Sequence, residues 1–422
     1  MNLTTIAQVN EFERALDEWV CAAFAHGVGS FPELIRSLPS VYPTDALRAV
    51  VRLRGELPSG WQVDGSHFTA LPSHDNWPVE HPLDFDWRFT PETTQKLVDR
   101  CPKSAADSVT ILGAPSVFQE AAMRGLQGSV VLFDRNPVLI AAVRNTSPQF
   151  KAVCADLVWG VQVRPGDAVV TIADPPWYPD DVVAFLWAAS RLTQIGGQVF
   201  LSLPPVGTRP GILPEREAIV ASAATFGLEL ASVEPEALTY LTPPFERNAL
   251  VAAGVPAVPC DWRRGDLAIF IATEKTSSPH PVPTGLHDKW DEVSVGVVRI
   301  KCRACTEVDF FDPTLSNLVR GDMLKSVSRR DPARMAAEVW TSGNRVFACA
   351  GSGVLRMIVS ALARGDDVKG AVIAGVGREL TGRETDLIRL AAEQVADLIR
   401  REEKELHAYG YRRSKRQLAE AI

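Results

Sequence analysis

The chain has 422 residues, of which 46% are apolar, with 44 basic and 51 acidic side chains and a formal net charge of −7. At about 150 residues per domain, this length predicts two or three domains. The acidic balance argues against wrapping a long stretch of nucleic acid, because phosphates need clustered Lys and Arg. No stretch approaches the ~18 apolar residues of a membrane span, and residues 1–5 lack a secretory signal pattern, so we expect a cytoplasmic protein without a membrane partner.

Residues 1–70 predict a winged-helix-like domain. Apolar positions at helical spacing indicate a helix over 11–28, and the segments 31–38 and 43–53 each carry a proline near a helix start. A glycine-bounded segment that resembles a wing follows them. Such a module either reads DNA through its third helix or serves in packing or dimerisation, and both interpretations stay open. The third helix carries three arginines, Arg48, Arg52 and Arg54.

Residues 85–275 predict a Rossmann-like domain, reached through a linker at 71–90 that is rich in Pro, His, Asp and Trp. Short apolar strands alternate here with amphipathic helices, which indicates a mostly parallel sheet covered on both faces. The last two strands, joined through an irregular stretch at 235–265, predict an antiparallel closing hairpin. The expected strands are 109–112, 130–134, 151–154, 168–173, 198–203, 228–233 and 267–273, with helices at 116–126, 137–145, 180–194 and 214–227.

Residues 290–422 predict a third, α+β domain after a Ser- and Pro-rich linker at 274–289. Its long helix, 381–406, begins with the capping-box pattern of Thr381 and Glu384. No motif assigns a role to this domain, so it is a candidate for binding a protein partner or for self-association.

The seven cysteines are scattered and odd in number, which is typical of reduced thiols rather than of a disulfide framework. Cys302 and Cys305 form the one closely spaced pair, and zinc is an alternative there with Cys260 and Cys349. A second CxxC or an HxxxH is missing, so we expect no metal site.

Ligands of a doubly wound sheet bind beyond the carboxyl ends of its strands, so the residues that follow each strand carry the functional signal. Gly113 and Ser116 follow the first strand in a turn whose N–H groups face a ligand. Asp134 follows the second strand, where a carboxylate accepts both ribose hydroxyls of an adenosyl group. Asp156 follows the third strand, in position to meet an adenine amino group.

The fourth strand ends at Asp174-Pro175-Pro176-Trp177, the most informative segment. Two prolines with fixed φ make a rigid turn that projects the flanking side chains and the Pro175 carbonyl into the cleft. A carboxylate and a carbonyl each accept an N–H, so the pair suits an amine, while Trp177 stacks on a planar substrate or faces a cationic donor. Three aromatic residues are added as candidate substrate contacts, Tyr178, Tyr240 and Phe245.

Asp-Pro-Pro-Trp after the fourth strand resembles the motif of enzymes that methylate amino nitrogens. A wider set of residues, from the helix start at Thr90 through Gly113, Asp134 and Asp156 to Asp174, resembles the branched-chain polyamine synthases in order and spacing. That resemblance spans roughly residues 12–275 and implies an N-terminal winged helix before a class I methyltransferase-type Rossmann domain. Those synthases carry an acidic run after the glycine, whereas this chain has Ala114-Pro115-Ser116.

Three functional hypotheses follow. The first is an S-adenosylmethionine-dependent N-methyltransferase that acts on an amine acceptor, either a small molecule or a nucleobase. The alternative is an aminopropyltransferase of the branched-chain polyamine synthase type, which takes decarboxylated S-adenosylmethionine. The third is a non-catalytic Rossmann-fold scaffold, because fold does not determine function.

Overall fold

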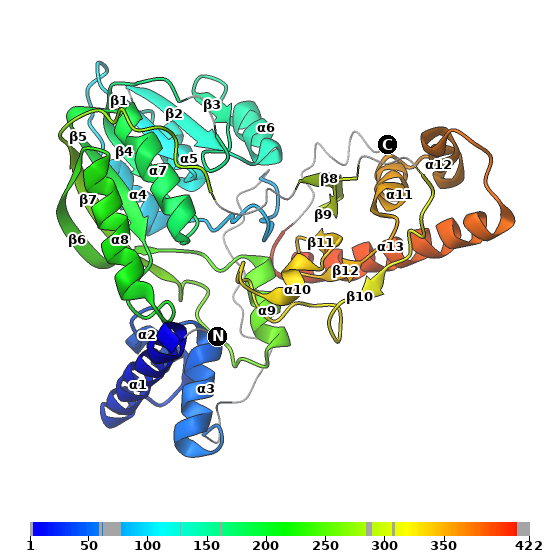
Figure 1. The fold of residues 1–422 in the computed structure, drawn as a ribbon, viewed down its shortest axis with the longest axis horizontal. Helices are drawn as coiled ribbons and strands as arrows, with labels where there is room; N and C mark the ends of the chain where they lie inside the picture. Colours follow the sequence, from blue (N-terminus) through cyan, green and yellow to red (C-terminus); the bar gives the residue numbers. More distant parts are fainter. Residues whose placement is uncertain are drawn as a thin grey trace. The chain divides into compact units, whose positions relative to one another are not determined.

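The computed structural model describes residues 3–58, 61, 77–126, 128–160, 163–283, 289–305 and 309–411 (Figure 1). The chain divides into two compact units. The first contains the described residues of Met1–His67, Trp87–Thr242 and Val255–Gly285. The second contains those of Phe68–Asp86, Pro243–Gly254 and Leu286–Ile422.

A seven-stranded sheet in the order β3-β2-β1-β4-β5-β7-β6 is the centre of the first unit. Strands β1 to β5 pair in parallel, and β7 runs antiparallel to both β5 and β6. This is the Rossmann-like, methyltransferase-type sheet that the sequence predicts, including the antiparallel last pair. The strands are β1 Ser108–Leu112, β2 Ser129–Asp134, β3 Lys151–Cys154, β4 Ala168–Ala173, β5 Thr193–Leu203, β6 Leu228–Thr239 and β7 Arg264–Ala272.

Five helices cover this sheet. Helix α4 packs against α5 and helix α7 against α8, while α6 lies against β3 (Figure 1). The central strands are short apolar runs because both of their faces are buried, and α7 contributes Val182, Phe185 and Leu186 to a buried cluster of that core. The helices are α4 Pro91–Asp99, α5 Pro115–Met123, α6 Pro137–Thr146, α7 Pro179–Leu192 and α8 Ile212–Thr225.

The stretch 235–265, expected to be irregular, is more ordered than predicted. Strand β6 continues to Thr239 through a register shift between Glu234 and Leu238, and helix α9, Pro244–Ala252, follows. Strand β6 lies at the edge of the sheet, where Pro235 is tolerated because an edge strand needs fewer ladder hydrogen bonds. The paired prolines before Phe245 are the start of α9, with Pro244 at its first position.

Three helices form the N-terminal part of the first unit, α1 Leu3–Ala25, α2 Phe31–Ser37 and α3 Pro43–Arg54. The guanidinium group of Arg264, at the start of β7, donates to the carbonyl oxygens of Arg36 at 2.8 Å and Leu38 at 3.2 Å. It thereby satisfies carbonyls at the carboxyl end of α2 and joins this helical region to the sheet. Most of the predicted wing, and therefore the winged-helix assignment, lies outside the described residues.

The second unit has a five-stranded antiparallel sheet in the order β10-β12-β11-β9-β8, the α+β arrangement predicted for the C-terminal region. The strands are β8 Trp290–Val295, β9 Val298–Arg303, β10 Ser316–Asn317, β11 Val339–Thr341 and β12 Val346–Ala348, and the helices besides α9 are α10 Pro332–Met335, α11 Ser352–Arg364, α12 Val368–Val376 and α13 Gly382–Ala408.

Residues 77–86, expected to be a linker, are part of this second unit. Asp84 forms ion pairs with Arg299 and Lys301, both buried on β9. His81 is fully buried, and its ring lies 3.2 Å from the carbonyl oxygen of Trp340. A segment without periodicity is therefore fixed by specific polar contacts, which a composition-based prediction of a linker does not detect.

Candidate active site

Four of the predicted residues follow strands that are neighbours in the sheet, in the spatial order Asp156, Asp134, Gly113 and Asp174. Because β3, β2, β1 and β4 are parallel, these residues share one edge of the sheet, which we call the carboxyl edge. Backbone bonds of 2.9 Å from Gly113 N to Phe133 O and from Asp174 N to Leu112 O continue the ladder past the strand ends. The fold therefore places the four residues that the sequence suggested for the donor and acceptor sites at the same edge of the sheet.

The turn after β1 leaves no room for a side chain at Gly113. This residue has φ of +65°, and a Cβ there would lie 3.0 Å from the carbonyl oxygen of Asp174 and 3.0 Å from the ring of Phe185. Only glycine adopts this conformation without strain, and its bare backbone lets the end of β4 and the ring of Phe185 pack directly against the turn. Gly113 therefore sets the close spacing between the ends of β1 and β4 at the middle of the carboxyl edge.

Asp134 and Asp156 each use one carboxylate oxygen to close their own turn. Asp134 Oδ1 accepts from Asn136 N at 2.8 Å, and Asp156 Oδ1 accepts from Val158 N at 3.0 Å. These bonds fix the direction of both carboxylates at the edge. Ser116 is different, because its buried hydroxyl oxygen accepts from Phe89 N at 3.3 Å and so holds the segment before α4.

Asp174 is partly exposed at the end of β4, and the phenol of Tyr240 donates to its Oδ1 at 2.6 Å. Burial, followed by the negative charge of Asp174, raises the pKa of Tyr240 well above its ordinary value of 10. The phenol therefore stays protonated and remains a donor. Tyr240 OH also lies 2.6 Å from Ser202 Oγ, which in turn accepts from Trp177 Nε1 at 3.0 Å.

The Pro-Pro turn itself is closed by a bond of 2.7 Å from Tyr178 N to Pro176 O. Arg209 donates to the carbonyl oxygen of Trp177 at 2.7 Å and lies over the ring of Tyr178, with 5.8 Å from Cζ to the centroid. Pro175 is buried inside this turn. The backbone of the Asp-Pro-Pro-Trp motif is thus fixed by a bond within the turn and by a bond from Arg209.

Four aromatic rings surround Arg263, which precedes β7. The distances from its Cζ to the ring centroids are 4.9 Å for Trp262, 5.0 Å for Trp87, 5.6 Å for Trp177 and 5.8 Å for Tyr42. One cation therefore already lies over Trp177, where the sequence suggested a substrate or a sulfonium.

Phe245 and Tyr240, predicted together as substrate contacts, belong to different units of the structure. Tyr240 belongs to the first unit and contacts Asp174, whereas Phe245 is buried on α9 in the second unit. Sequence reasoning missed Ser202, Arg263 and Gly265. Ser202 carries the one recognisable signal, a polar residue between Leu201 and Leu203 near the end of an apolar strand.

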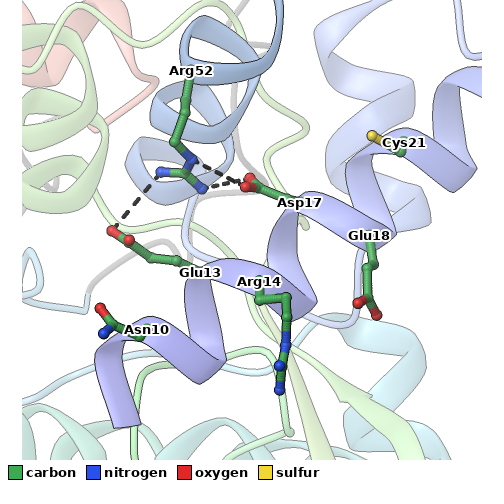
Figure 2. A pocket seen from close by; sticks show the side chains of 7 residues that line it. All are labelled: Asn10, Glu13, Arg14, Asp17, Glu18, Cys21 and Arg52. Atoms are coloured by element: carbon green, nitrogen blue, oxygen red, sulfur yellow. Dashed lines mark hydrogen bonds and ion pairs between the residues drawn. The ribbon is translucent and has the colours of Figure 1, made fainter. Parts of the chain in front are cut away.

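A separate surface hollow lies between α1 and α3 (Figure 2). Arg52 points into it and donates to Asp17 at 2.5 and 3.1 Å, and it also pairs with Glu13 at 3.8 Å. Arg48 pairs with Asp45, and Arg54 lies 4.0 Å from the centroid of Phe24. The arginines predicted to face DNA are thus engaged within these helices, and DNA phosphates would have to compete with those contacts. The hollow is lined by Asn10, Glu13, Arg14, Asp17, Glu18, Cys21 and Arg52.

Within the part of the chain that the structure describes, no group of three or more His, Cys, Asp or Glu side chains is arranged to hold a metal ion. Cys302 and Cys349 are buried in the second unit, and burial raises the pKa of each thiol to about 12. Cys305 is exposed. A search of the described helices found none with the length and apolar character that a membrane crossing requires.

The order of the seven strands is that of the Rossmann-like, methyltransferase-type fold. Among solved structures, the chain is similar to the branched-chain polyamine synthase from Thermus thermophilus in complex with N4-aminopropylspermidine and 5′-methylthioadenosine. The TM-score is 0.50 at 14% identity, over 68% of this chain and 97% of the synthase. A mutein of the same synthase gives 0.51 at 14% identity, over 67% and 95%.

The chain is also similar to a TehB-like S-adenosylmethionine-dependent methyltransferase from Corynebacterium glutamicum, with a TM-score of 0.31 at 14% identity over 44% of this chain and 87% of that one. No protein-family model matches the sequence, and no curated protein matches it either.

Proposed function

We propose that this protein transfers an alkyl group from a sulfonium donor of the S-adenosylmethionine type to an amine nitrogen. The observation that carries the proposal is the hydrogen bond from Tyr240 to Asp174 at the carboxyl edge, beside Gly113 and the two donor-side carboxylates. Tyr240 donates its one proton to Oδ1 of Asp174, so that oxygen is an acceptor. A carboxylate that only accepts selects a partner that brings N–H groups.

The residues of this chain fit each part of that task. We assign Asp134 to the ribose hydroxyls and Asp156 to the adenine amino group of the donor, because both carboxylates follow strands on the same side of Gly113 at the carboxyl edge. When bound, the donor supplies an electrophilic carbon attached to a positively charged sulfur. Asp174 and the carbonyl of Pro175 accept N–H bonds from the acceptor amine and direct its lone pair towards that carbon. As the nitrogen–carbon bond forms, the carbon–sulfur bond breaks and the sulfur leaves as a neutral thioether. The positive charge passes to the alkylated nitrogen, which then releases a proton to solvent, so no metal is needed.

Aminopropyl transfer is the form of the reaction that we favour. The polyamine synthase fold matches about two thirds of the chain and nearly the whole of the synthase, whereas the methyltransferase match covers less of the chain. The synthase structure contains a branched polyamine and methylthioadenosine, which are the products of aminopropyl transfer.

Methyl transfer is the second candidate because of one observation in the turn after β1. The residues that follow Gly113 are Ala114, Pro115 and Ser116, none of which carries a charge. A decarboxylated donor and a polyamine both present ammonium groups that need carboxylates, and this turn supplies none.

Isothermal titration with S-adenosylmethionine and, separately, its decarboxylated form tests the proposal. We expect one of the two to bind, and Asp134→Ala to weaken it about 10-fold to 100-fold, because charge-assisted hydrogen bonds contribute about 1.5–3 kcal/mol each. Asp167→Ala is the matched control, since Asp167 is exposed at the opposite edge, just before β4. A preference for one donor decides between the two reactions. If neither donor binds at millimolar concentration, the protein is a scaffold and the proposal fails.

A second experiment addresses the acceptor. Mass spectrometry of reactions that contain the preferred donor and either a linear polyamine or a nucleoside mixture should detect an alkylated amine. Asp174→Asn should lower turnover by at least 100-fold while donor binding persists, because the amide replaces an accepting oxygen with an N–H group. Retained turnover in Asp174→Asn would contradict the assigned role of this residue.

A further inference from the structure

Four neighbouring strands place four residues side by side at the carboxyl edge. In spatial order they are Asp174 after β4, Ser202 near the end of β5, Gly265 at the start of β7 and Tyr240 after β6. Strand β7 is antiparallel to its neighbours, so its start lies at the edge where the others end. Tyr240 must therefore cross β7 to reach Ser202 and Asp174.

Gly265 makes that crossing possible. A Cβ at this position would lie 3.0 Å from Trp177 Cζ2, 3.3 Å from Ser202 Oγ and 3.3 Å from Tyr240 Cε2. These distances are tighter than ordinary van der Waals contact, so a side chain at 265 would displace at least one of the three groups. Gly265 lies where the ladders of β7 become irregular: Leu238 is its partner on β6, directly after the register shift between Glu234 and Leu238, and the pairing of β7 with β5 ends one residue away, at Asp266 opposite Leu203.

The hydrogen bonds among these residues have one consistent direction. The indole N–H of Trp177 has no accepting capacity and donates to Ser202 Oγ at 3.0 Å. Tyr240 gives its proton to Asp174, so the bond of 2.6 Å between the two hydroxyls must be donated by Ser202. The chain therefore runs from Trp177 through Ser202 and Tyr240 to the Asp174 carboxylate, with every hydroxyl both donating and accepting.

The same contacts restrict the indole of Trp177. Its N–H is held by Ser202, the ring of Tyr240 meets it edge-on at 5.6 Å between centroids, and Arg263 lies over its face. Trp177 is partly exposed, so it remains accessible although its plane is fixed. The indole acts as a fixed wall beside Asp174 rather than as a mobile stacking platform.

We infer that Ser202 is a positioning residue of this site, which sets the plane of Trp177 and, through Tyr240, the direction of the Asp174 carboxylate towards an acceptor amine. This inference rests on the proposed function, since it concerns the same reaction. Ser202 is buried and touches neither donor-side carboxylate. Its loss should therefore act on the acceptor step and leave donor binding intact.

Ser202→Ala tests this inference in the full-length protein. We expect kcat to fall about 10-fold to 100-fold, because a misplaced reacting group costs rates of that order. The donor Kd should stay within about twofold of wild type. Tyr240→Phe should have a similar effect, and the double variant should be little worse than the poorer single variant, because residues of one chain are not additive.

A spectroscopic measurement provides a readout that does not need turnover. In protein labelled with 5-fluorotryptophan, the Trp177 fluorine resonance is identified by its absence in Trp177→Phe. Ser202→Ala should shift or broaden that resonance. The control is Thr171→Val. This substitution removes a buried hydrogen bond of 2.7 Å between the hydroxyls of Thr171 on β4 and Thr193 on β5, and it should leave the Trp177 resonance in place.

Two outcomes would overturn the inference. In the first, Ser202→Ala leaves the Trp177 resonance unchanged, as Thr171→Val does. In the second, Ser202→Ala moves the resonance but keeps the wild-type kcat. Failure of the proposed function has a separate signature, since the wild-type protein would then bind neither donor. The fluorine resonance would still decide whether Ser202 fixes Trp177.

Discussion

The phenol of Tyr240 donates a hydrogen bond of 2.6 Å to the carboxylate of Asp174, although 66 positions separate the two residues in the sequence. Asp174 follows a central strand and Tyr240 an edge strand, with two strands between them. The bond therefore depends on the antiparallel β7, whose second residue, Gly265, has no side chain to obstruct the phenol.

Gly265→Ala should disturb this arrangement without touching any polar group. Its Cβ would lie 3.0 Å from Trp177 Cζ2, so we expect a loss of about 1–3 kcal/mol in the free energy of unfolding from overpacking. Urea denaturation followed by circular dichroism measures it. Gly29→Ala is the control, because its Cβ would meet only Glu33 Oε2 at 3.7 Å, and equal losses in both variants would contradict the prediction.

Gly113→Ala tests the tight turn at the middle of the edge. The variant must hold φ near +65° with a side chain and must also accommodate a Cβ 3.0 Å from the Asp174 carbonyl oxygen. We expect a cost of about 1–2 kcal/mol from the backbone conformation and a donor affinity at least tenfold weaker. Calorimetric titration of the folded variant gives the affinity. Wild-type affinity would place the donor away from Gly113.

Much of this site could be predicted because buried parallel strands have a recognisable sequence pattern. Apolar runs such as 168–173 alternate with helices, and ligand-binding residues then follow the strands, which is how Asp134, Asp156 and Asp174 were identified. The structure places all three at the same edge. Their roles towards a donor or an acceptor stay predictions.

The remaining contacts could not be predicted, for a physical reason. Ser202 and Gly265 matter only through their neighbours across the sheet, and a strand's sequence does not say which residue of another strand will lie beside it. Residues 77–86 present the same difficulty, since their burial depends on charges of β9 more than 200 positions away. Composition gave these residues the appearance of a linker.

Arg263→Gln should show how much the aromatic cluster contributes to stability. The guanidinium group lies between 4.9 and 5.8 Å from four ring centroids, so we expect a loss of about 1–2 kcal/mol in the free energy of unfolding. Arg54→Gln, which removes a guanidinium from the single ring of Phe24, is the matched control and should cost about 0.5 kcal/mol. A smaller loss in Arg263→Gln than in the control would contradict this.

The same variant has a functional consequence if the acceptor is a polyamine. Arg263 places a positive charge over Trp177, next to the Asp174 site, and like charges repel. Arg263→Gln should therefore lower the KM for a linear triamine more than the KM for a monoamine. Equal changes for both amines would show that this charge does not reach the acceptor.

His81 gives the second unit a dependence on pH. Its Nδ1 accepts from Leu83 N at 3.2 Å, so its Nε2 carries the proton and donates to the carbonyl oxygen of Trp340. Burial, followed by the positive charges of Lys301 and Arg299, lowers the pKa of His81 well below its ordinary value of 6.5. The folded protein therefore holds a neutral imidazole. Protonation of Nδ1 would remove the acceptor of the Leu83 N–H and bring two N–H groups face to face.

The sign of the pH effect follows from that lowered pKa. Near pH 6.5 the unfolded chain binds a proton at His81 and the folded chain does not. The contribution of the neutral His81 to the free energy of unfolding is therefore fully present above pH 6.5 and is lost as the pH falls below it. The slope should reach about 1.4 kcal/mol per pH unit. His81→Gln supplies one acceptor and one donor without a titrating group, so urea denaturation at pH 7.5 and 5.5 should show a smaller loss on acidification than in wild type. His26→Gln, at an exposed histidine after α1, should keep the wild-type slope, and equal slopes in all three proteins would contradict the assignment to His81.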